Sequence, residues 1–427
     1  MAKVVRKLRE HWKKTVFFSS VAAFGASYWR DRRAEKAIET EFCRSAAEIG
    51  NELLAVASEP RSVAVLLNPF AGVGKCQTKF DSWAAPVLYL AGLKVDVVRS
   101  DTAGQTRALA RVLEASDFGG LDAVVIAGGD GSLSEAVTGF LTRPDETPPA
   151  PIVFLPLGAT NEFAKREKIG VEDIAKAAFA AVNGKQKALD VVKASVEDLW
   201  GAESRQPVYV MNGLRLGPVV DAEVDARRHW WWGSLRRHWT FFKTALRGRF
   251  DPVRVKIEFR EPCAGCQACL NIGKKRRQEN LSVMRSGSWW ERWRSPVVVK
   301  ASNDNEVDVD AFDTDCDLPW HTLELDIADL SVQLSDDGSL DVKVFRGCTS
   351  AWDFFSYGTA SEDDRRNNLE MFKAGKVIVH PSVELVEAED GGGLVEKEVF
   401  YYFDGEKYVV KPVVASVLRE RVNFLTP

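Results

Sequence analysis

Three glycine-rich turns, each after an apolar run that predicts a buried strand, supply the backbone best suited to hold phosphate in this 427-residue sequence. Backbone N–H groups at the start of a helix lack intrahelical partners, and the helix dipole there favours anions. Three such turns in one strand–helix series predict a nucleotide-phosphate site. The turns are Asn68-Pro69-Phe70-Ala71-Gly72-Val73-Gly74-Lys75, Gly128-Gly129-Asp130-Gly131-Ser132 and Pro156-Leu157-Gly158-Ala159-Thr160-Asn161.

Each turn taken alone is a weak signal. A single Gly-Gly-Asp-Gly sequence is most often a tight turn without a ligand. The lysine-containing turn is not a P-loop, because Cys76 stands where Ser or Thr should follow Lys75 and the spacing differs. Ser100 begins a further strand-to-helix turn on the same predicted edge. The combination of turns, rather than any single one, carries the prediction.

Two turns carry carboxylates that could take part in chemistry. Asp130 lies in the second glycine turn, and Asp404 and Glu406 lie in a separate predicted turn near the C-terminus. Phosphoryl transfer needs a divalent metal to spread charge and a group that accepts the proton of the acceptor hydroxyl. A carboxylate beside phosphate-binding amides would repel a nucleotide unless Mg²⁺ intervenes or the carboxylate faces that hydroxyl. The structural alternatives are a helix cap at Asp130 and an ordinary hairpin at Asp404-Gly405.

The elements that must position these residues change character along the chain. Strands and helices alternate over 60–185, which predicts an α/β nucleotide domain with a parallel sheet and ligands at the carboxyl ends of its strands. Short, partly alternating runs over 186–427 predict a mostly antiparallel β-sandwich, interrupted by a polar insertion at about 261–320. The predicted fold class is therefore α/β plus β. The strands predicted in the first domain are Ser62–Asn68, Leu93–Arg99, Leu121–Ala127 and Pro151–Leu155.

Residues 1–59 form a separate predicted unit with a basic lead, an apolar stretch and a charged helix. The uncharged stretch Thr15–Trp29 would extend roughly 22 Å as a helix, which falls short of the ~30 Å hydrocarbon core of a bilayer. A basic segment with almost no acid is typical of a mitochondrial presequence or of an anchor that lies in the membrane interface. The alternative is an amphipathic helix that caps the fold. The net charge of −4 indicates no class of partner.

Basic and aromatic residues are interleaved between Arg227 and Arg249, a segment without any acid that includes Trp230–Trp232 and Trp239. Tryptophan prefers the membrane–water interface, and basic side chains attract anionic head groups, so contact with a membrane surface is predicted. The alternatives are a packed aromatic core and, less favoured, a stacking platform for nucleic acid; no nucleic-acid partner is expected. Trp289–Arg294 is a second cluster of the same kind.

The seven cysteines do not indicate an exported disulfide scaffold, because their number is odd and they are dispersed. Cys263, Cys266 and Cys269 have the spacing of metal ligands, but a fourth ligand is not evident. An unstructured or redox-sensitive loop is the favoured interpretation, and no metal ligand is assigned. The acidic segment Ser302–Asp317 lacks the glycine and terminal Glu of a calcium loop and is interpreted as a solvated loop.

The three glycine turns, in this order, resemble the catalytic domain of the diacylglycerol kinase and sphingosine kinase superfamily. The family patterns read Asn-Pro-x-x-Gly-x-Gly-Lys, Gly-Gly-Asp-Gly-Thr and Pro-Leu-Gly-Thr-x-Asn-Asp-Phe-Ala. Here Ser132 and Ala159 each stand in place of a Thr, and Glu162 stands in place of an Asp. The resemblance implies a kinase that uses ATP and Mg²⁺, with Asp130 and Glu406 as catalytic carboxylates; either could be the base.

The same resemblance implies two sets of binding residues. Asp221, Glu223 and Arg215 belong to the segment that holds the head group of the lipid acceptor. The residues assigned to the nucleotide are Asn68, Pro69, Gly72, Gly74, Lys75, Ser100, Gly128, Gly129, Asp130, Gly131, Ser132, Gly158, Thr160, Asn161, Arg236 and Asp404.

Within the superfamily, Leu8–Thr15, Asn212–Gly217 and Trp231–Thr244 resemble the mitochondrial acylglycerol kinases. This resemblance implies monoacylglycerol and diacylglycerol as acceptors, and lysophosphatidic and phosphatidic acid as products. It also implies a location on the mitochondrial inner membrane, facing the intermembrane space, with carrier-translocase subunits as further partners. A structural subunit of that translocase is the alternative function, and ceramide or sphingosine are alternative acceptors. The apolar N-terminal stretch and the Trp/Arg clusters argue against an NAD kinase.

Overall fold

The structure is a computed structural model of the whole chain. The described residues are 12–51, 60–102, 104–113, 120–143, 149–159, 161–169, 174–196, 207–248, 250–263, 318–348, 350–361, 364–365, 367–382, 385–387, 394–396, 400–409 and 411–427.

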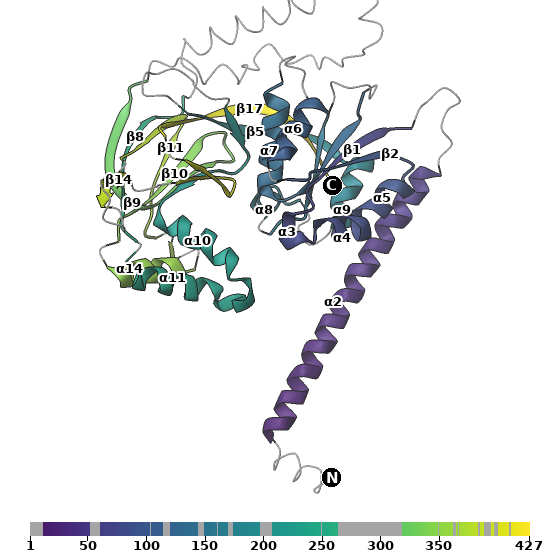
Figure 1. The fold of residues 1–427 in the computed structure, drawn as a ribbon. Coiled ribbons are helices and arrows are strands. Elements are labelled where there is room, and N and C mark those ends of the chain that lie inside the picture. The colour runs from purple at the N-terminus through teal and green to yellow at the C-terminus, as the bar shows by residue number, and fades with distance from the viewer. Residues whose placement is uncertain are drawn as a thin grey trace, which may run out of the picture.

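A parallel sheet forms the first half of the fold, in the strand order β4-β3-β1-β2. The central strands β3 and β4 are buried along their whole length, which explains their unbroken apolar sequences. Helices α6 and α7 pack against each other, and α5 and α9 form a second pair that lies apart from the first (Figure 1). The strands are β1 (Ser62–Leu67), β2 (Lys94–Arg99), β3 (Ala123–Gly128) and β4 (Ile152–Pro156).

Short helices follow the strands of this half. The second glycine turn leads directly into α7, and the third leads into α8, so both turns stand at helix N-termini as predicted. The helices are α3 (Ala71–Gly74), α4 (Cys76–Lys79), a π-helical turn (Phe80–Ala84), α5 (Ala85–Leu90), α6 (Gln105–Val112), α7 (Asp130–Leu141), α8 (Glu162–Arg166) and α9 (Ile174–Asn183).

Antiparallel strands form the second half, and they continue the same sheet. The long strand β17 pairs with β5 along most of its length and meets β4 in parallel at Phe424 and Ile152. A bend at Glu420, which has φ +48°, interrupts the β5–β17 pairing and lets one strand serve both halves. The mixture of parallel and antiparallel strands confirms the predicted fold class.

The strands of the second half enclose a separate apolar core. They are β5 (Lys185–Val196), β6 (Val208–Val210), β7 (Gly213–Leu216), β8 (Val253–Arg260), β9 (His321–Leu334), β10 (Leu340–Arg346), β11 (Glu370–Ala374), β12 (Lys376–Pro381), β15 (Phe400–Phe403), β16 (Glu406–Val409) and β17 (Val413–Thr426). The strands β13 (Leu385–Glu387) and β14 (Leu394–Glu396) form a separate two-stranded sheet.

A group of helices lies at one end of this second half (Figure 1). Val219, Phe241 and Phe354, one from each of three helices, form a small core with the underside of the sheet. The aromatic run Trp230–Leu235 forms a 3₁₀ helix with a kink at Gly233 rather than a strand. The helices are α10 (Pro218–Arg228), η2 (Trp230–Leu235), α11 (Arg236–Leu246) and α14 (Ala351–Thr359).

The N-terminal helix α2 (Trp12–Gly50) is continuous over 39 residues and projects away from the rest of the molecule (Figure 1). Only its C-terminal part packs on the fold: Ala46 is fully buried, and α2 contacts α5 and α9. Within the described residues, no helix combines the length and apolar character needed to cross a membrane.

Candidate active site

The glycine turns lie side by side because neighbouring parallel strands end at the same edge of the sheet. The amide of Asn68, just after β1, donates to the carbonyl of Ala127 in β3 at 3.0 Å. The amide of Leu157, just after β4, donates to the carbonyl of Gly128 at 2.8 Å. These hydrogen bonds join three segments that are far apart in the sequence, and they place the predicted phosphate-binding backbone in one location.

Glycine is required where these turns touch. A Cβ atom on Gly158 would lie 2.3 Å from the Cα atom of Gly129, and a Cβ atom on Gly72 would lie 2.3 Å from the carbonyl oxygen of Leu157. Gly74 has φ +74° with nothing within 4 Å of its Cβ position, so its backbone borders open space. The result is a surface of bare backbone that fits the phosphate groups of ATP.

Polar side chains hold the turns in place. Asn68 donates from Nδ2 to Oγ of Ser132 at 2.8 Å, which links the first turn to the second. Asn161, with φ +49°, accepts from the amide of Gly158 at 3.0 Å and so closes the third turn on itself. Oγ of Ser100 is buried and has no hydrogen-bond partner among the described residues. A nucleotide bound at this edge would supply a partner for that hydroxyl.

Asp130 begins α7, but its carboxylate reaches across to the start of α8. Oδ2 accepts from the amide of Glu162 at 2.8 Å, and Oδ1 accepts from the amide of Phe163 at 3.1 Å. Asp130 therefore caps α8 and not the helix that it begins, which holds its carboxylate rigidly between two phosphate-binding turns.

Glu406 reaches the same place from the opposite end of the chain. A Cβ atom on Gly131 would lie 2.5 Å from Oε1 of Glu406, so this carboxylate rests against the first turn of α7, beside Asp130. The structure thus brings together the two carboxylates that the sequence assigned to catalysis. Their individual roles stay predictions.

Asp404, at φ +46°, holds the loop between β6 and β7. Oδ2 accepts from the amide of Met211 at 2.7 Å, and Oδ1 accepts from the amides of Asn212 and Gly213 at 2.9 and 3.1 Å. Burial, together with the negative charge of nearby Asp130, raises the pKa of Asp404 to about 7 against the opposing effect of these N–H donors. Asp404 thus anchors the turn that presents Glu406; its predicted contact with the nucleotide stays a prediction.

Glu135, on α7, belongs to this carboxylate group although the sequence analysis did not single it out. Burial raises the pKa of Glu135, and the negative charge of Glu406 adds to the effect. Oε2 of Glu135 is buried without a hydrogen-bond partner among the described residues. The sequence could have indicated Glu135 as an acidic residue on the helix that follows a phosphate-binding turn. Its proximity to Glu406 is evident only from the structure.

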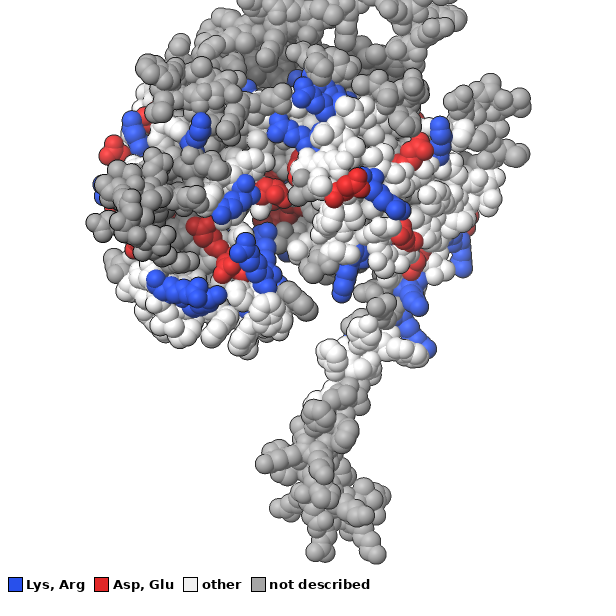
Figure 2. All heavy atoms as spheres, viewed as in Figure 1, with Lys and Arg blue, Asp and Glu red and all other residues white. Residues whose placement is uncertain are grey.

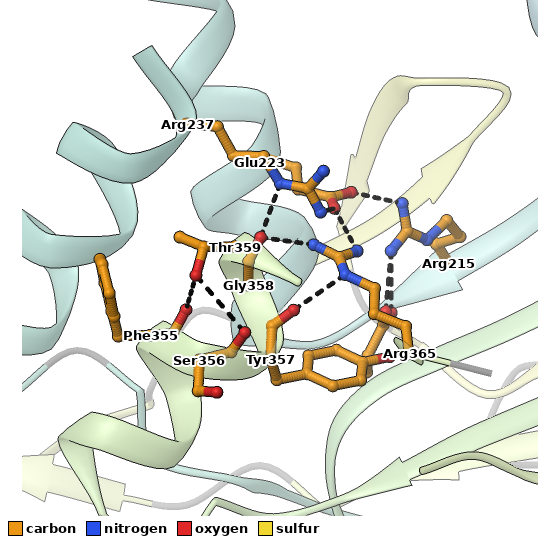
Figure 3. Close-up of polar contacts among 10 residues, drawn as sticks. Arg215, Glu223, Arg237, Phe355, Ser356, Tyr357, Gly358, Thr359 and Arg365 are labelled. Carbon is orange, nitrogen blue, oxygen red and sulfur yellow. Dashed lines mark hydrogen bonds and ion pairs between the residues drawn. The ribbon is translucent and has the colours of Figure 1, made fainter. Parts of the chain in front are cut away.

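Two of the residues predicted to bind the lipid head group, Arg215 and Glu223, belong to an ion-pair cluster (Figure 3). Arg215 pairs with Glu223 at 2.6 Å and with Asp329 at 2.8 Å. Glu223 also accepts from Arg365 at 2.8 Å and lies 3.5 Å from Arg237. Burial alone would raise the pKa of Glu223, but the arginines outweigh it and lower the pKa.

Asp221, the remaining residue of that predicted set, accepts a hydrogen bond from the hydroxyl of Tyr402 at 2.6 Å. Burial raises the pKa of Asp221 in spite of this bond. All three side chains are thus engaged within the protein, so a lipid hydroxyl would have to share or displace these contacts. Their contact with substrate stays a prediction.

One pocket joins the two groups of residues. It is lined by Asp130 and Asp404 on the side of the glycine turns, and by Arg215, Glu223 and Arg227 on the side of the helices. Figure 2 shows a hollow between the two halves of the molecule where acidic and basic side chains gather. The predicted nucleotide residue Arg236 is exposed on α11 and is not part of the lining.

Several predicted residues lie outside the described part of the chain. They are Thr160, Cys266, Cys269, the cluster Trp289–Arg294 and the acidic segment Ser302–Asp317. Among the residues that are described, no group of three or more His, Cys, Asp or Glu side chains is arranged to hold a metal ion. The carboxylates beside the cradle fit a Mg²⁺ ion that arrives with the nucleotide, since hard cations prefer oxygen ligands and share them with phosphates.

Comparison with known proteins agrees with this geometry. Residues 62–194 match the family model described as the diacylglycerol kinase catalytic domain. Over 99% of the chain and 96% of the relative, the sequence is 28% identical to "Acylglycerol kinase, mitochondrial" of Mus musculus. The protein of the same name from Xenopus laevis is 34% identical over 61% of each chain.

A solved structure is similar in fold. A putative diacylglycerol kinase from Bacillus anthracis str. Sterne superimposes with a TM-score of 0.52, covers 87% of this chain and 98% of its own, and is 15% identical. At that identity the likeness supports the fold alone. The matched domain contains all three glycine turns, whereas Glu406 comes from the segment beyond it.

Proposed function

We propose that the chain is a lipid kinase that transfers the γ-phosphate of ATP to a hydroxyl of monoacylglycerol and diacylglycerol. The match of residues 62–194 to the diacylglycerol kinase catalytic domain and the similarity to proteins named acylglycerol kinase support this proposal. The products would be lysophosphatidic acid and phosphatidic acid. The observation that carries the proposal is the single pocket in which the glycine-turn carboxylate Asp130 faces the helices of the second half.

Each part of the site has a role in this reaction. The bare backbone of the glycine turns binds the phosphates, and Ser132 and Asn68 keep two of the turns together. Mg²⁺ bound with ATP would spread the negative charge of the phosphates. Glu406 or Asp130 accepts the proton of the attacking hydroxyl, since Glu406 rests against the first turn of α7 and the carboxylate of Asp130 extends from that turn to the start of α8.

The acceptor is a membrane lipid, so the pocket must open toward a bilayer. We define the aromatic face as the exposed side chains Trp231, Trp232, Trp239, Phe242 and Trp352. Trp232 and Trp239 stack with their ring centres 5.0 Å apart. These residues come from η2, α11 and α14, and α11 is linked to the pocket wall by the contact between Arg237 and Glu223.

A membrane is the partner that fits the aromatic face. Lys243 lies on α11 and the exposed Arg247 directly follows this helix, and basic side chains near tryptophans are typical of a surface that binds anionic lipid. Helix α2 extends toward the same side of the molecule as α11 and α14 (Figure 1). We propose that the protein is located on the mitochondrial inner membrane, facing the intermembrane space; the similarity to proteins named as mitochondrial supports the mitochondrial part of this proposal.

The test is a transfer assay with the purified full chain. Labelled ATP and Mg²⁺ are supplied with micelles of monoacylglycerol, diacylglycerol, ceramide or sphingosine, and the labelled lipids are separated. Label in lysophosphatidic and phosphatidic acid is the expected result. Label only in the ceramide or sphingosine product would change the acceptor class, and ATP consumption without any labelled lipid would contradict a lipid kinase.

A further inference from the structure

Two cations line the pocket, and they differ in their bonding. Arg215 is paired with both Glu223 and Asp329, at 2.6 and 2.8 Å, so its charge is compensated within the protein. Arg227 lines the same pocket but has no ion pair with any other described residue. A cation without a counter-ion at the edge of an anion-binding cradle is available to bind phosphate.

The position of Arg227 is defined by the turn that presents Glu406. Its Nη1 atom lies 3.2 Å from the place where a Cβ on Gly405 would stand, and Nη2 lies 3.8 Å from it. The guanidinium therefore rests on the bare backbone of Gly405, between Asp404 and Glu406. The positive charges of Arg228 and Arg227 both act on Tyr402, but of these two arginines Arg227 is the one that lines the pocket.

We propose that Arg227 is a further catalytic residue that contacts the γ-phosphoryl group as it passes from ATP to the lipid hydroxyl. This rests on the proposed function, because it assumes that ATP is the donor. In the step, the bond between the γ-phosphorus and the oxygen bridging to the β-phosphate breaks, and a bond from phosphorus to the acceptor oxygen forms. The hydroxyl proton goes to Glu406 or Asp130, and ADP leaves with the bridging oxygen.

The physical reason is charge. The transferred group carries negative charge on its equatorial oxygens in the transition state, and a positioned arginine stabilises it. Around the cradle, Asp130, Glu162 and Asp404 line the pocket as acids, so without a cation the protein side of the pocket would oppose an incoming phosphate. Arg227 comes from α10, across the pocket from the glycine turns, and could approach the phosphoryl group from the acceptor side.

The experiment compares Arg227→Ala, Arg227→Gln and Arg227→Lys with Arg228→Ala in the full chain. Arg228 is a matched control, since it is the next residue on α10, is 83% exposed at its side chain and lies 3.8 Å from Asp225. The measurements are kcat and KM for ATP and lipid, the dissociation constant of ADP, and Tm. The predicted loss in kcat for Arg227→Ala and Arg227→Gln is about 10²-fold or more, the scale of removing one transition-state donor.

Arg227→Lys should recover part of the rate, because it keeps the charge but not the fork of donors. ADP affinity and Tm should match the wild type, because ADP lacks the transferred group and Arg227 is exposed. Equal kcat for Arg227→Ala and Arg228→Ala would overturn the proposal. A variant at Arg227 that raised the KM for lipid without lowering kcat would also overturn it. So would a loss of ADP affinity as large as the loss in kcat. A wild-type chain that labels no lipid would instead contradict the proposed function itself.

Discussion

At the scale of single residues, the contact between Gly131 and Glu406 offers a way to move one carboxylate without removing it. A methyl group on Gly131 would lie 2.5 Å from Oε1 of Glu406, which is the end of a flexible side chain. Gly131 lies in the first turn of α7 and is absent from the glycines with positive φ, so alanine suits its backbone.

Gly131→Ala should therefore displace Glu406 and lower the rate of phosphate transfer by at least about 10-fold, since small misplacements of a catalytic group are costly. Its Tm should stay near that of the wild type. Gly139→Ala, in the same helix, is the matched control, because its Cβ would lie 2.4 Å from the backbone oxygen of Arg107 and should lower Tm. If Gly131→Ala transferred phosphate at the normal rate, Glu406 would not act at this turn.

Asp404 gives a prediction about pH. Its pKa in the folded protein is about 7, above the ordinary value of 3.8, because burial disfavours the charged form. Folding is then favoured by protonation, so this contribution is complete at low pH and is lost as the pH rises through about 7. Asn cannot ionise, so Asp404→Asn should remove this part of the pH dependence.

The measurement is Tm at about pH 5.5 and about pH 8 for the wild type and for Asp404→Asn, with ligand-free protein. We expect Tm to fall more steeply toward high pH in the wild type than in the variant. The absolute Tm of the variant is not informative, because an amide cannot accept all three N–H bonds. Parallel pH profiles would show that Asp404 does not titrate in this range.

The proximity of Asp130 and the three glycine turns could be predicted from the sequence, because the turns that follow parallel strands all lie at the same edge of the sheet. The sequence was not sufficient for the head-group residues. The partners of Glu223 include Arg365, which lies 142 residues away and follows no motif. Arg227 was missed for a similar reason, since nothing local marks it apart from Arg228.

At the scale of elements, the proposed membrane contact depends on the helices that carry the aromatic face. Trp231 and Trp352 are 64% and 72% exposed, so their removal should leave the core intact. Trp352 comes from α14, more than a hundred residues after Trp231. The sequence therefore predicted only the α11 side of the face, because α14 adds an isolated tryptophan without a basic run.

The double variant Trp231→Ala, Trp352→Ala should bind vesicles of phosphatidylcholine and cardiolipin less well, and should lose activity on vesicle-embedded diacylglycerol. Activity on a short-chain soluble diacylglycerol should be kept, because the pocket itself is unchanged. Phe241→Ala is the control: Phe241 is fully buried, so its truncation should lower Tm by removing about 3–5 kcal/mol of stability. Equal losses on both substrates with a lowered Tm would assign the two tryptophans to the core instead.

At the scale of the whole molecule, α2 is joined to the fold only through its C-terminal part, near Ala46. Removal of residues 1–30 should therefore leave the catalytic fold and the activity on soluble substrate intact. Attachment to mitochondrial membranes should be lost or become sensitive to salt, because the remaining contact would depend on charge. Extraction with carbonate and with high salt measures this directly. A truncated chain that resists both as well as the full chain would place the anchor elsewhere.

The fold class of the whole molecule followed from the change in strand pattern, but the connection between its halves did not. A single strand, β17, belongs to both halves because of the bend at Glu420, and a bend that separates two sets of partners has no signature in periodicity. Because β17 joins the two halves, the carboxyl ends of the parallel strands and the helices of the second half line one pocket.

The most direct test of the account is the rate of label transfer from ATP to monoacylglycerol by the wild type and by Asp130→Asn, measured side by side with Mg²⁺ on one micelle preparation. The substitution keeps the shape of the side chain and removes its charge. We predict a rate at least about 10²-fold lower for the variant, the scale of losing one acid–base group. Tm should also fall, because an amide can accept only one of the two N–H bonds at the start of α8, so the rates are compared below the Tm of both proteins. Equal rates for the two proteins would contradict the assignment of the reaction to this pocket.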